Sequence, residues 1–171
     1  MLDFIDAILG TSITLIRTFE KQIKELDKTI ERIMKGIPQT LQTIPGVGPV
    51  FTAGIIAEIG QVERFANEAK IAKYAGLYWR KHQSGRFTAD DTSLSRNGNQ
   101  YLRYYLVEAA NSVRRQIPEY REYYAKKYQE VPKHQHKRAL VLTARKFVRL
   151  VDALLRKNQI YTPKRSVIHE A

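Results

Sequence analysis

Apolar positions between residues 5 and 33 alternate spacings of four and three residues, as in a heptad repeat. The positions, in chain order, are Ile5, Leu9, Ser12, Ile16, Phe19, Ile23, Leu26, Ile30 and Ile33, and all of them except Ser12 are apolar. Charged side chains of both signs lie between them, as on the flanking and solvent-facing sides of a coiled-coil helix. This stripe is narrower than the apolar face of most globular helices, so it favours pairing with a second copy over packing within the chain. We predict a coiled-coil dimerisation arm over residues 1–36.

After Gly36 and Pro38, which end this arm, the pattern predicts a helical domain over residues 37–160. Helical periodicity indicates helices over residues 50–59, 66–74, 100–116 and 137–158. Residues 77–99 lack such a period, so a loop or a short hairpin is expected there. Residues 161–171 form a basic tail. The predicted fold class is therefore mainly α.

Positive charge is concentrated in the second half of the chain. Of a formal net charge of +12, residues 96–171 carry 17 basic and 6 acidic side chains, whereas residues 1–95 carry 12 and 11. This excess is larger than solubility requires and indicates a polyanionic partner. The basic residues of the later predicted helices have spacings that can form a cationic face for phosphate groups: Arg114, Arg115, Lys137, Arg138, Arg145, Lys146 and Arg149.

Tyrosines are interspersed among these basic residues. Three of them, Tyr101, Tyr104 and Tyr105, lie in one predicted helix, and others follow between Pro118 and Pro132. Stacking on unpaired bases beside phosphate contacts would use this mixture of side chains. Packing in the protein core is an equal alternative.

Several classes of site and compartment are excluded by composition. The chain has no cysteine, which excludes disulfide bonds, thiolate catalysis and cysteine-ligated zinc. The adjacent acids Asp90 and Asp91 cannot alone hold two separated metal ions, and the histidines lack metal-binding neighbours. No apolar run has the length of a membrane span, and the N-terminus lacks the features of a signal peptide. We therefore expect a cytoplasmic protein with no membrane partner.

The most specific local motif is Ile44–Pro49, with the sequence IPGVGP. Gly46 and Gly48 let the chain turn tightly and bring backbone amides close to a phosphate, and the final proline suits the start of a helix. Unpaired N–H groups and the helix dipole favour an anion at such a helix start. Residues 38–60 thus resemble a helix-hairpin-helix element, which holds the DNA backbone without reading sequence. Gly46, Val47 and Gly48 are candidate DNA contacts, and an ordinary tight turn is the alternative.

Two further motifs follow the hairpin. Residues Gly76–Gly85 have the sequence GLYWRKHQSG, and residues Ser95–Arg103 have the sequence SRNGNQYLR. Together with the hairpin, and in this order and spacing, they resemble the C-terminal transposase domain of the insertion sequence 110 family, whose relatives include the Piv DNA invertase. The resemblance covers about residues 43–115, and the coiled coil before it also fits.

This resemblance implies a recombinase guided by a bridge RNA, which exchanges DNA strands through a covalent serine–DNA intermediate. By position, Ser84 would be the nucleophile, and Ser95 is the second choice. Arg80 and Arg103 would stabilise the charge that develops on the phosphate. The remaining residues of these segments that are expected to contact nucleic acid are Lys81, Arg86, Arg96 and Asn99.

The sequence departs from the family pattern in three respects. Trp79 replaces a proline, and Ala89, Asp90 and Asp91 lie in a loop that is usually basic, so contacts of this loop with DNA are expected to differ. The family also has an N-terminal RuvC-like acidic domain, and no spaced acidic tetrad of that type occurs in these residues. Magnesium is expected only in such a domain. The chain alone is therefore expected to bind DNA without recombining it.

The leading alternative is a helix-hairpin-helix scaffold that binds nucleic acid without catalysis, in which Ser84 is structural. A coiled-coil protein on anionic membranes is less favoured, because the apolar seam and the excess charge lie in different parts of the chain. Under the transposase interpretation the partners are DNA, a guide RNA and a second copy of the chain. The expected location is the bacterial nucleoid.

Overall fold

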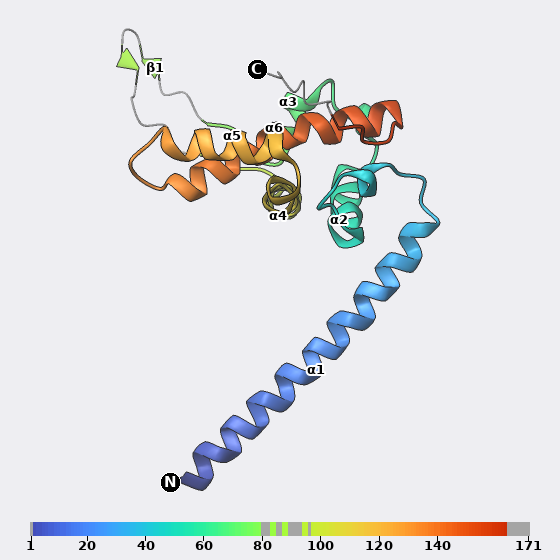
Figure 1. Cartoon of the computed structure of the whole chain (residues 1–171), viewed down its shortest axis with the longest axis vertical. Helices are drawn as coiled ribbons and strands as arrows, with labels where there is room; N and C mark the ends of the chain where they lie inside the picture. The colour runs from blue at the N-terminus through green and yellow to red at the C-terminus, as the bar shows by residue number, and fades with distance from the viewer. Residues whose placement is uncertain (1, 80–82, 85–86, 89–93, 96, 164–171) are drawn as a thin grey trace, which may run out of the picture. The chain divides into compact units, whose positions relative to one another are not determined.

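The chain is mainly α-helical, as its sequence predicts (Figure 1). A computed structural model describes residues 2–79, 83–84, 87–88, 94–95 and 97–163. Its elements are α1 (Leu2–Lys35), the 3₁₀ helix η1 (Leu41–Thr43), α2 (Pro49–Ile59), the 3₁₀ helix η2 (Val62–Arg64), α3 (Glu68–Tyr74), β1 (Gln83–Ser84), β2 (Phe87–Thr88), α4 (Gln100–Gln116), α5 (Pro118–Gln129) and α6 (Gln135–Lys157). In the region where a loop or short hairpin is predicted, β1 pairs antiparallel with β2.

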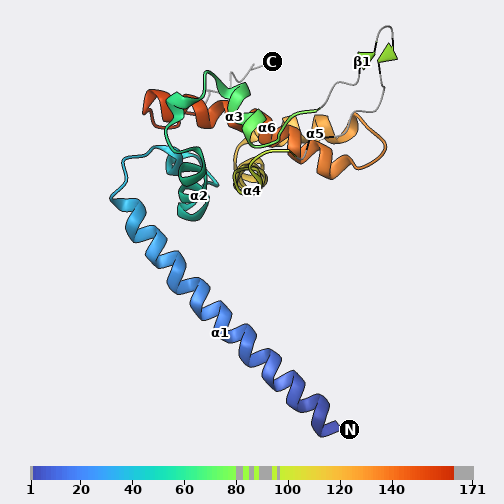
Figure 2. The same ribbon diagram turned by 180° about the vertical axis from the view of Figure 1, so that it is seen from behind.

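Two units make up the chain, residues 1–38 and residues 39–171. The first unit is the single helix α1, which is continuous from end to end in both views (Figures 1 and 2). At its end the amide of Gly36 donates to the carbonyl of Ile33 over 3.0 Å. Pro38 follows, and a proline cannot continue a helix because it lacks the amide hydrogen. The predicted helix therefore forms and ends where the sequence indicates.

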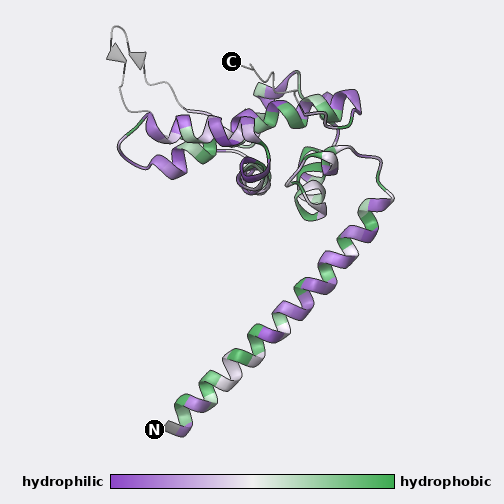
Figure 3. Cartoon of the chain, viewed as in Figure 1, coloured by the Kyte–Doolittle hydropathy of each residue, from purple (hydrophilic) through white to green (hydrophobic). Residues whose placement is uncertain are grey.

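Most apolar side chains of α1 are exposed, although Met34 near its end is buried. Phe19, Ile23 and Leu26, in the middle of the predicted seam, are 58%, 56% and 62% exposed. Figure 3 shows apolar residues recurring along the whole helix, with polar residues between them. A single helix has nothing within its own unit to cover such a stripe. Pairing with a second α1 helix stays a prediction.

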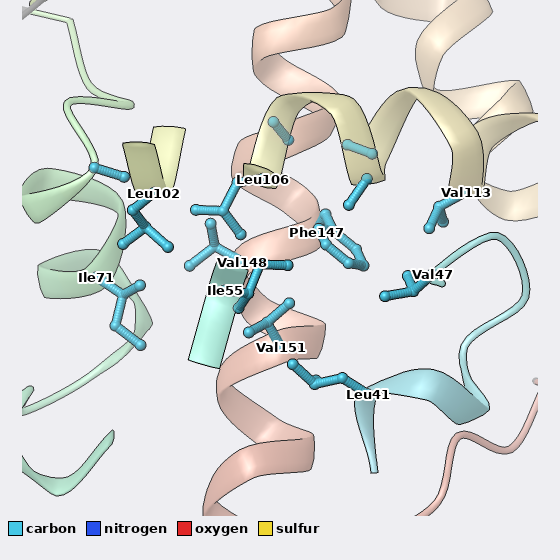
Figure 4. Close-up of a cluster of buried hydrophobic side chains, with 14 of the residues drawn as sticks. Leu41, Val47, Ile55, Ile71, Leu102, Leu106, Val113, Phe147, Val148 and Val151 are labelled. Carbon is cyan, nitrogen blue, oxygen red and sulfur yellow. The ribbon is translucent and has the colours of Figure 1, made fainter. Parts of the chain in front are cut away.

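Helix α6 lies at the centre of the second unit, in contact with α3, α4, α5 and both 3₁₀ helices. Its side chains Phe147, Val148 and Val151 are completely buried. They point toward Ile55 of α2 and Leu106 of α4 (Figure 4). The core therefore joins elements from the whole of residues 39–171.

Helix boundaries agree closely with the sequence pattern where a capping residue or a proline marks them. Helix α4 covers the predicted residues 100–116, and α6 begins two residues before the predicted start. Helix α3 begins at Glu68, two residues later than predicted, because Asn67 caps it by accepting a hydrogen bond from the amide of Lys70 over 3.2 Å. Residues 62–64 form a separate 3₁₀ turn before this cap.

The IPGVGP motif forms a tight turn that is held by the core. Gly46 has φ +91°, and a Cβ atom added to it would lie 3.0 Å from the backbone of Ser112 in α4. A side chain here would be strained and would also push α4 away. Only one 3₁₀ turn, Leu41–Thr43, precedes the motif, whereas α2 follows it directly. The helix-hairpin-helix assignment is therefore not confirmed, although the turn and the second helix are present.

Candidate nucleic-acid interface

The candidate nucleophile Ser84 lies in strand β1. In the two-residue pairing with β2, Ser84 is opposite Phe87 and Gln83 is opposite Thr88. Four other predicted site residues lie outside the described residues: Arg80, Lys81, Arg86 and Arg96.

The second candidate, Ser95, is part of the folded core of this region. Trp79 and Leu94 form an antiparallel bridge, and the amide of Ser95 donates to the carbonyl of Tyr78 over 2.8 Å. The Ser95 side chain is 3% exposed, and its hydroxyl has no hydrogen-bond partner among the residues that the structure describes. A phosphodiester cannot reach a hydroxyl that is buried in this way without a rearrangement of the 94–95 segment.

Arg103 stabilises the turn that follows α3. One of its guanidinium nitrogens donates to the carbonyl of Ala75 over 3.1 Å. The same nitrogen lies 2.5 Å from the place where a Cβ atom on Gly76 would be, so only glycine leaves room for it. The guanidinium also lines an open pocket between α3 and the start of α4. Arg103 therefore has a structural role in addition to its predicted role of stabilising charge on a phosphate.

Asn99 makes several hydrogen bonds within the fold. Its side-chain carbonyl oxygen accepts hydrogen bonds from the backbone amides of Tyr101 and Leu102, each over 3.0 Å, and so caps α4. Its side-chain nitrogen donates to Glu58 over 2.6 Å and to the hydroxyl of Tyr74 over 3.2 Å. A predicted nucleic-acid contact thus fixes the start of α4 against α2 and α3, and its amide has little capacity left for a ligand.

The hairpin presents less free backbone than its sequence suggests. Val47 is only 5% exposed, and its amide donates to the carbonyl of Ile44 over 3.0 Å. Gly48 is the N-terminal cap of α2 and has nothing within 4 Å of an added Cβ atom. The amides of Gly48, Val50 and Phe51 precede the first hydrogen bond of α2, which joins the amide of Thr52 to the carbonyl of Gly48. Any backbone contact to a phosphate would therefore use these amides.

Most of the arginines predicted to face DNA also have partners inside the protein. Arg145 donates to the carbonyl of Leu77 over 3.1 Å, and Arg138 pairs with Glu130 over 3.3 Å. Arg114 donates to Asn111 over 2.8 Å and lies 4.1 Å from the ring centre of Tyr124. Arg114 thus links α4 to α5, Arg138 links α6 to the end of α5, and Arg145 links α6 to the segment after α3.

A second group of cations stays on the surface. Arg115 and Lys137 are exposed, as are Arg121, Lys126, Arg149 and Lys157 on the same three helices. Glu119 on α5 and Glu130 just after it are meanwhile neutralised, since Lys146 pairs with Glu119 over 2.9 Å and Lys127 pairs with Glu130. Hydrogen bonds from the side chains of Lys127 and Arg138 hold the pKa of Glu130 below its usual value. The outer surface of these helices therefore keeps an excess of positive charge.

The open pocket beside Arg103 was not predicted from the sequence. It has a volume of about 860 Å³. Its lining comprises Lys70, Lys73, Tyr74, Tyr78, Asn97, Gly98, Asn99, Gln100, Tyr101 and Arg103. The signal for the pocket in the sequence was the grouping of two lysines and a tyrosine within five residues of one short helix. Only the fold brings that helix next to residues 97–103.

The hydroxyl of Tyr74 at the edge of this pocket is polarised by its neighbours. Hydrogen bonds from Asn99 and then from Arg64 lower the pKa of Tyr74 from its ordinary value. Arg64 also lies 5.0 Å from the ring centre of Tyr74. The tyrosine is thereby held in one orientation at the pocket.

Comparison with known families agrees with the arrangement of these motifs. A family model described as the transposase IS116/IS110/IS902 family matches residues 38–125, just over half of the chain. The chain belongs to this transposase family. The matched region includes the hairpin, the β1–β2 pair, the pocket and the first two thirds of α5. The resemblance inferred from three short motifs is confirmed.

Individual relatives of this transposase chain cover more of its length. An uncharacterized protein of insertion element IS116 from Streptomyces clavuligerus is 29% identical over 156 residues, which are 91% of this chain and 37% of that protein. A pilin gene-inverting protein from Moraxella bovis is 28% identical over 162 residues, or 91% of this chain and 49% of that protein. The transposase of insertion sequence element IS1111A from Coxiella burnetii is 28% identical, over 60% of this chain and 26% of its own length. The chain thus spans half or less of the length of these relatives.

The described part of this transposase chain offers no ligand set for a divalent metal ion. No group of three histidine, aspartate or glutamate side chains in it is placed to hold one. The magnesium that the family resemblance implies is expected only in a RuvC-like domain, and the residues described do not form a site for it. No described helix has both the length and the apolar character needed to cross a membrane.

Proposed function

We propose that this chain is the DNA-binding and strand-exchange domain of an insertion-sequence transposase, and that Ser84 is its nucleophile. The observation that carries the proposal is the position of Ser84 in β1, inside the region that matches the transposase family. The pilin gene-inverting relatives support a recombination reaction, because inversion of a gene requires DNA strands to be cut and rejoined. Nucleoid association in a bacterium is part of the same proposal.

In the proposed reaction the hydroxyl oxygen of Ser84 attacks a phosphodiester. A bond forms between that oxygen and phosphorus while the bond from phosphorus to the leaving strand breaks. The serine proton is lost and the leaving oxygen gains one, so the exchange consumes no net proton. Negative charge builds up on the phosphate, and cations nearby lower the barrier. Arg80 and Arg103 are the proposed cations.

Ser84 is favoured over Ser95 on the ground of access. The hydroxyl of Ser95 is buried beneath the Trp79–Leu94 bridge. A nucleophile for DNA has to meet a bulky phosphate in line with the leaving group. The buried hydroxyl of Ser95 meets this requirement only after a rearrangement of the 94–95 segment, so Ser84 is the proposed nucleophile.

Exposed cations on α4, α5 and α6 support DNA binding. We propose that the surface side chains, such as Arg115, Lys126, Lys137 and Arg149, contact the phosphate backbone. Displacement of counterions would then make the affinity fall by about a thousandfold between 50 and 200 mM salt if about six phosphates are contacted. Fluorescence anisotropy with a labelled duplex over this salt range tests the point. Binding that is independent of salt would contradict it.

Two partners complete the proposal. A second copy would pair through α1, whose apolar stripe is exposed. A guide RNA would bind the same cationic domain, since RNA and DNA share the phosphate backbone. The magnesium-binding RuvC-like half belongs to the larger enzyme, so this chain alone is expected to bind DNA without recombining it.

The decisive experiment replaces Ser84 with alanine in a recombination-competent transposase that contains this chain. We expect Ser84→Ala to abolish both recombination and the protein–DNA adduct that survives denaturation in detergent, while duplex affinity stays within about twofold of wild type. Ser95→Ala is the matched control and should leave the adduct in place. Recombination by the Ser84→Ala protein would favour the alternative of a non-catalytic nucleic-acid scaffold.

A further inference from the structure

The pocket between α3 and the start of α4 is built rigidly. A Cβ atom on Gly98 would lie 2.5 Å from the carbonyl oxygen of Tyr74, so the 97–99 backbone crosses directly over the end of α3. Gly98 has φ +144°, a conformation that side chains rarely adopt. The amide of Asn99 donates to the same Tyr74 carbonyl over 2.7 Å. The walls of the pocket are thus fixed by backbone contacts.

Positive charge dominates the lining. Lys70, Lys73 and Arg103 contribute cations, and none of the lining residues that the structure describes is an aspartate or glutamate. Lys70 and Lys73 are exposed, and neither side chain has an ion-pair partner among the residues that the structure describes. Two exposed lysines on one wall of a pocket attract an anionic group such as a phosphate.

Aromatic rings provide the rest of the surface. Tyr74, Tyr78 and Tyr101 line the pocket, and Tyr101 is 61% exposed. Tyr104, one turn further along α4, lies outside the pocket lining. Its ring packs edge-on with the Tyr105 ring, with the ring centres 5.4 Å apart. No such ring partner is recorded for Tyr101 among the described residues. An exposed ring beside cations is the usual platform for a nucleic-acid base.

We propose that this pocket binds one unpaired nucleotide, with its base stacked on Tyr101 and its phosphate beside Lys70 and Lys73. The volume of about 860 Å³ lies within the range of small-ligand sites, about 300–1,000 Å³. A base in a duplex has both faces covered by its neighbours, so only an unpaired or displaced base can use the ring. The ligand is therefore a single-stranded or displaced segment, of DNA or of RNA.

This inference deepens the proposed nucleic-acid binding and depends on it, but it does not depend on Ser84 as the nucleophile. It assigns a separate task to residues 70–74 and 97–101. Strand exchange requires bases to leave one duplex before they enter another. A pocket for one unpaired nucleotide would hold the displaced nucleic-acid strand at that step.

The test compares single-stranded with duplex probes on the full 171-residue chain. Labelled eight-nucleotide oligothymidine, its uridine RNA counterpart and a blunt duplex are titrated by fluorescence anisotropy at fixed salt. Tyr101→Ala is expected to weaken binding of the single strands about tenfold and to change duplex binding by less than twofold. The double variant Lys70→Gln with Lys73→Gln is expected to weaken single-strand binding by a similar or larger factor.

Matched controls separate the pocket from general effects. Tyr104→Ala removes the same ring from the same helix at nearly equal exposure, 58% against 61%. Lys126→Gln with Lys157→Gln removes two exposed lysines elsewhere. The tyrosine control should leave single-strand binding unchanged. The lysine control should lower single-strand and duplex affinity by the same factor. Circular dichroism melting shows whether each variant is folded.

A base analogue gives a second readout. The fluorescence of 2-aminopurine in a single strand changes when the base stacks, and we expect Tyr101→Ala, but not Tyr104→Ala, to abolish the change on binding. Equal losses for the two tyrosine variants would overturn the pocket while leaving DNA binding intact. Failure of the wild-type chain to bind any probe at low salt would overturn the proposed function as well. Loss with the DNA probe, the RNA probe or both supports the pocket and identifies the strand that uses it.

Discussion

Helix α6 buries most of its apolar side chains, whereas α1 exposes most of its own, although both helices are long and amphipathic. Phe147 and Val151 of α6 are completely buried within residues 39–171, while Phe19 and Ile23 of α1 are 58% and 56% exposed. A buried stripe stabilises the domain that contains it, but an exposed one lowers the free energy only when another surface covers it. The two helices therefore serve different properties, domain stability for α6 and association for α1.

The width of the stripe accounts for this difference. Buried positions of α6 recur as adjacent pairs four residues apart: Ala139 and Leu140, Thr143 and Ala144, Phe147 and Val148, and Val151 and Asp152. Such a face is broad enough to contact α3, α4 and α5 at once. The apolar positions of α1 instead alternate spacings of three and four residues, which suits a single partner helix. The pattern of spacing, not the amount of apolar surface, distinguishes a core helix from a pairing helix.

A pair of phenylalanine substitutions offers the strongest test of this comparison. The ring of Phe147 is completely buried and packs edge-on with the Tyr120 ring, with the ring centres 6.3 Å apart. Phe147→Ala removes this ring and should lower the free energy of unfolding by about 3–5 kcal/mol. Phe19→Ala on α1 should leave the unfolding of residues 39–171 within about 0.5 kcal/mol of wild type. Guanidinium denaturation followed by Trp79 fluorescence measures both. A loss below 1 kcal/mol for Phe147→Ala would contradict the central position of α6.

Charges placed in the stripe of α1 test its role in association. The double variant Ile16→Asp with Ile23→Asp puts two carboxylates into the predicted seam, and should weaken self-association at least about a hundredfold because each charge would be buried without a partner. Lys21→Asp with Lys28→Asp has the same seven-residue spacing on the opposite side of the helix and is the control. Sedimentation equilibrium measures the association constant. Identical values for the two double variants would remove the coiled-coil interpretation.

Helices, their ends and the family could be predicted because these features depend on neighbouring residues. The predicted bounds of α4 are those observed, since Asn99 caps the start and Pro118 begins the next helix. The hairpin and the two later motifs identify the family through residues that are close together in sequence. Local signals of this kind survive in the folded chain.

Roles that depend on distant partners could not be predicted. Arg145 meets a carbonyl 68 positions away, at Leu77, and Asn99 meets Glu58, which is 41 positions away. Both side chains have the chemistry of a phosphate contact, so the sequence alone does not reveal that the fold uses them. The pocket near Tyr101 could not be predicted for the same reason, because it exists only where residues 97–99 cross the end of α3.

Two ion pairs with the same helical spacing give the finest comparison of the units. Arg156 and Asp152 on α6 are 2.8 Å apart with side chains 30% and 13% exposed, whereas Lys35 and Glu31 on α1 are 3.7 Å apart and 76% and 56% exposed. Arg156 also donates to the carbonyls of Val62 and Phe65, 94 and 91 positions away. Its removal would leave an acid and two carbonyls without their partner.

Arg156→Ala is therefore expected to lower the free energy of unfolding by about 1–3 kcal/mol. Lys35→Ala should change it by at most about 0.5 kcal/mol, because water solvates an exposed pair nearly as well as its partner does. Guanidinium denaturation of the two variants and wild type, at one salt concentration, gives both differences. Raising the salt should erase the small effect of Lys35→Ala and leave most of the loss from Arg156→Ala, because partly buried groups are screened less. Equal losses would mean that Arg156 does not join η2 to α6 as the structure describes.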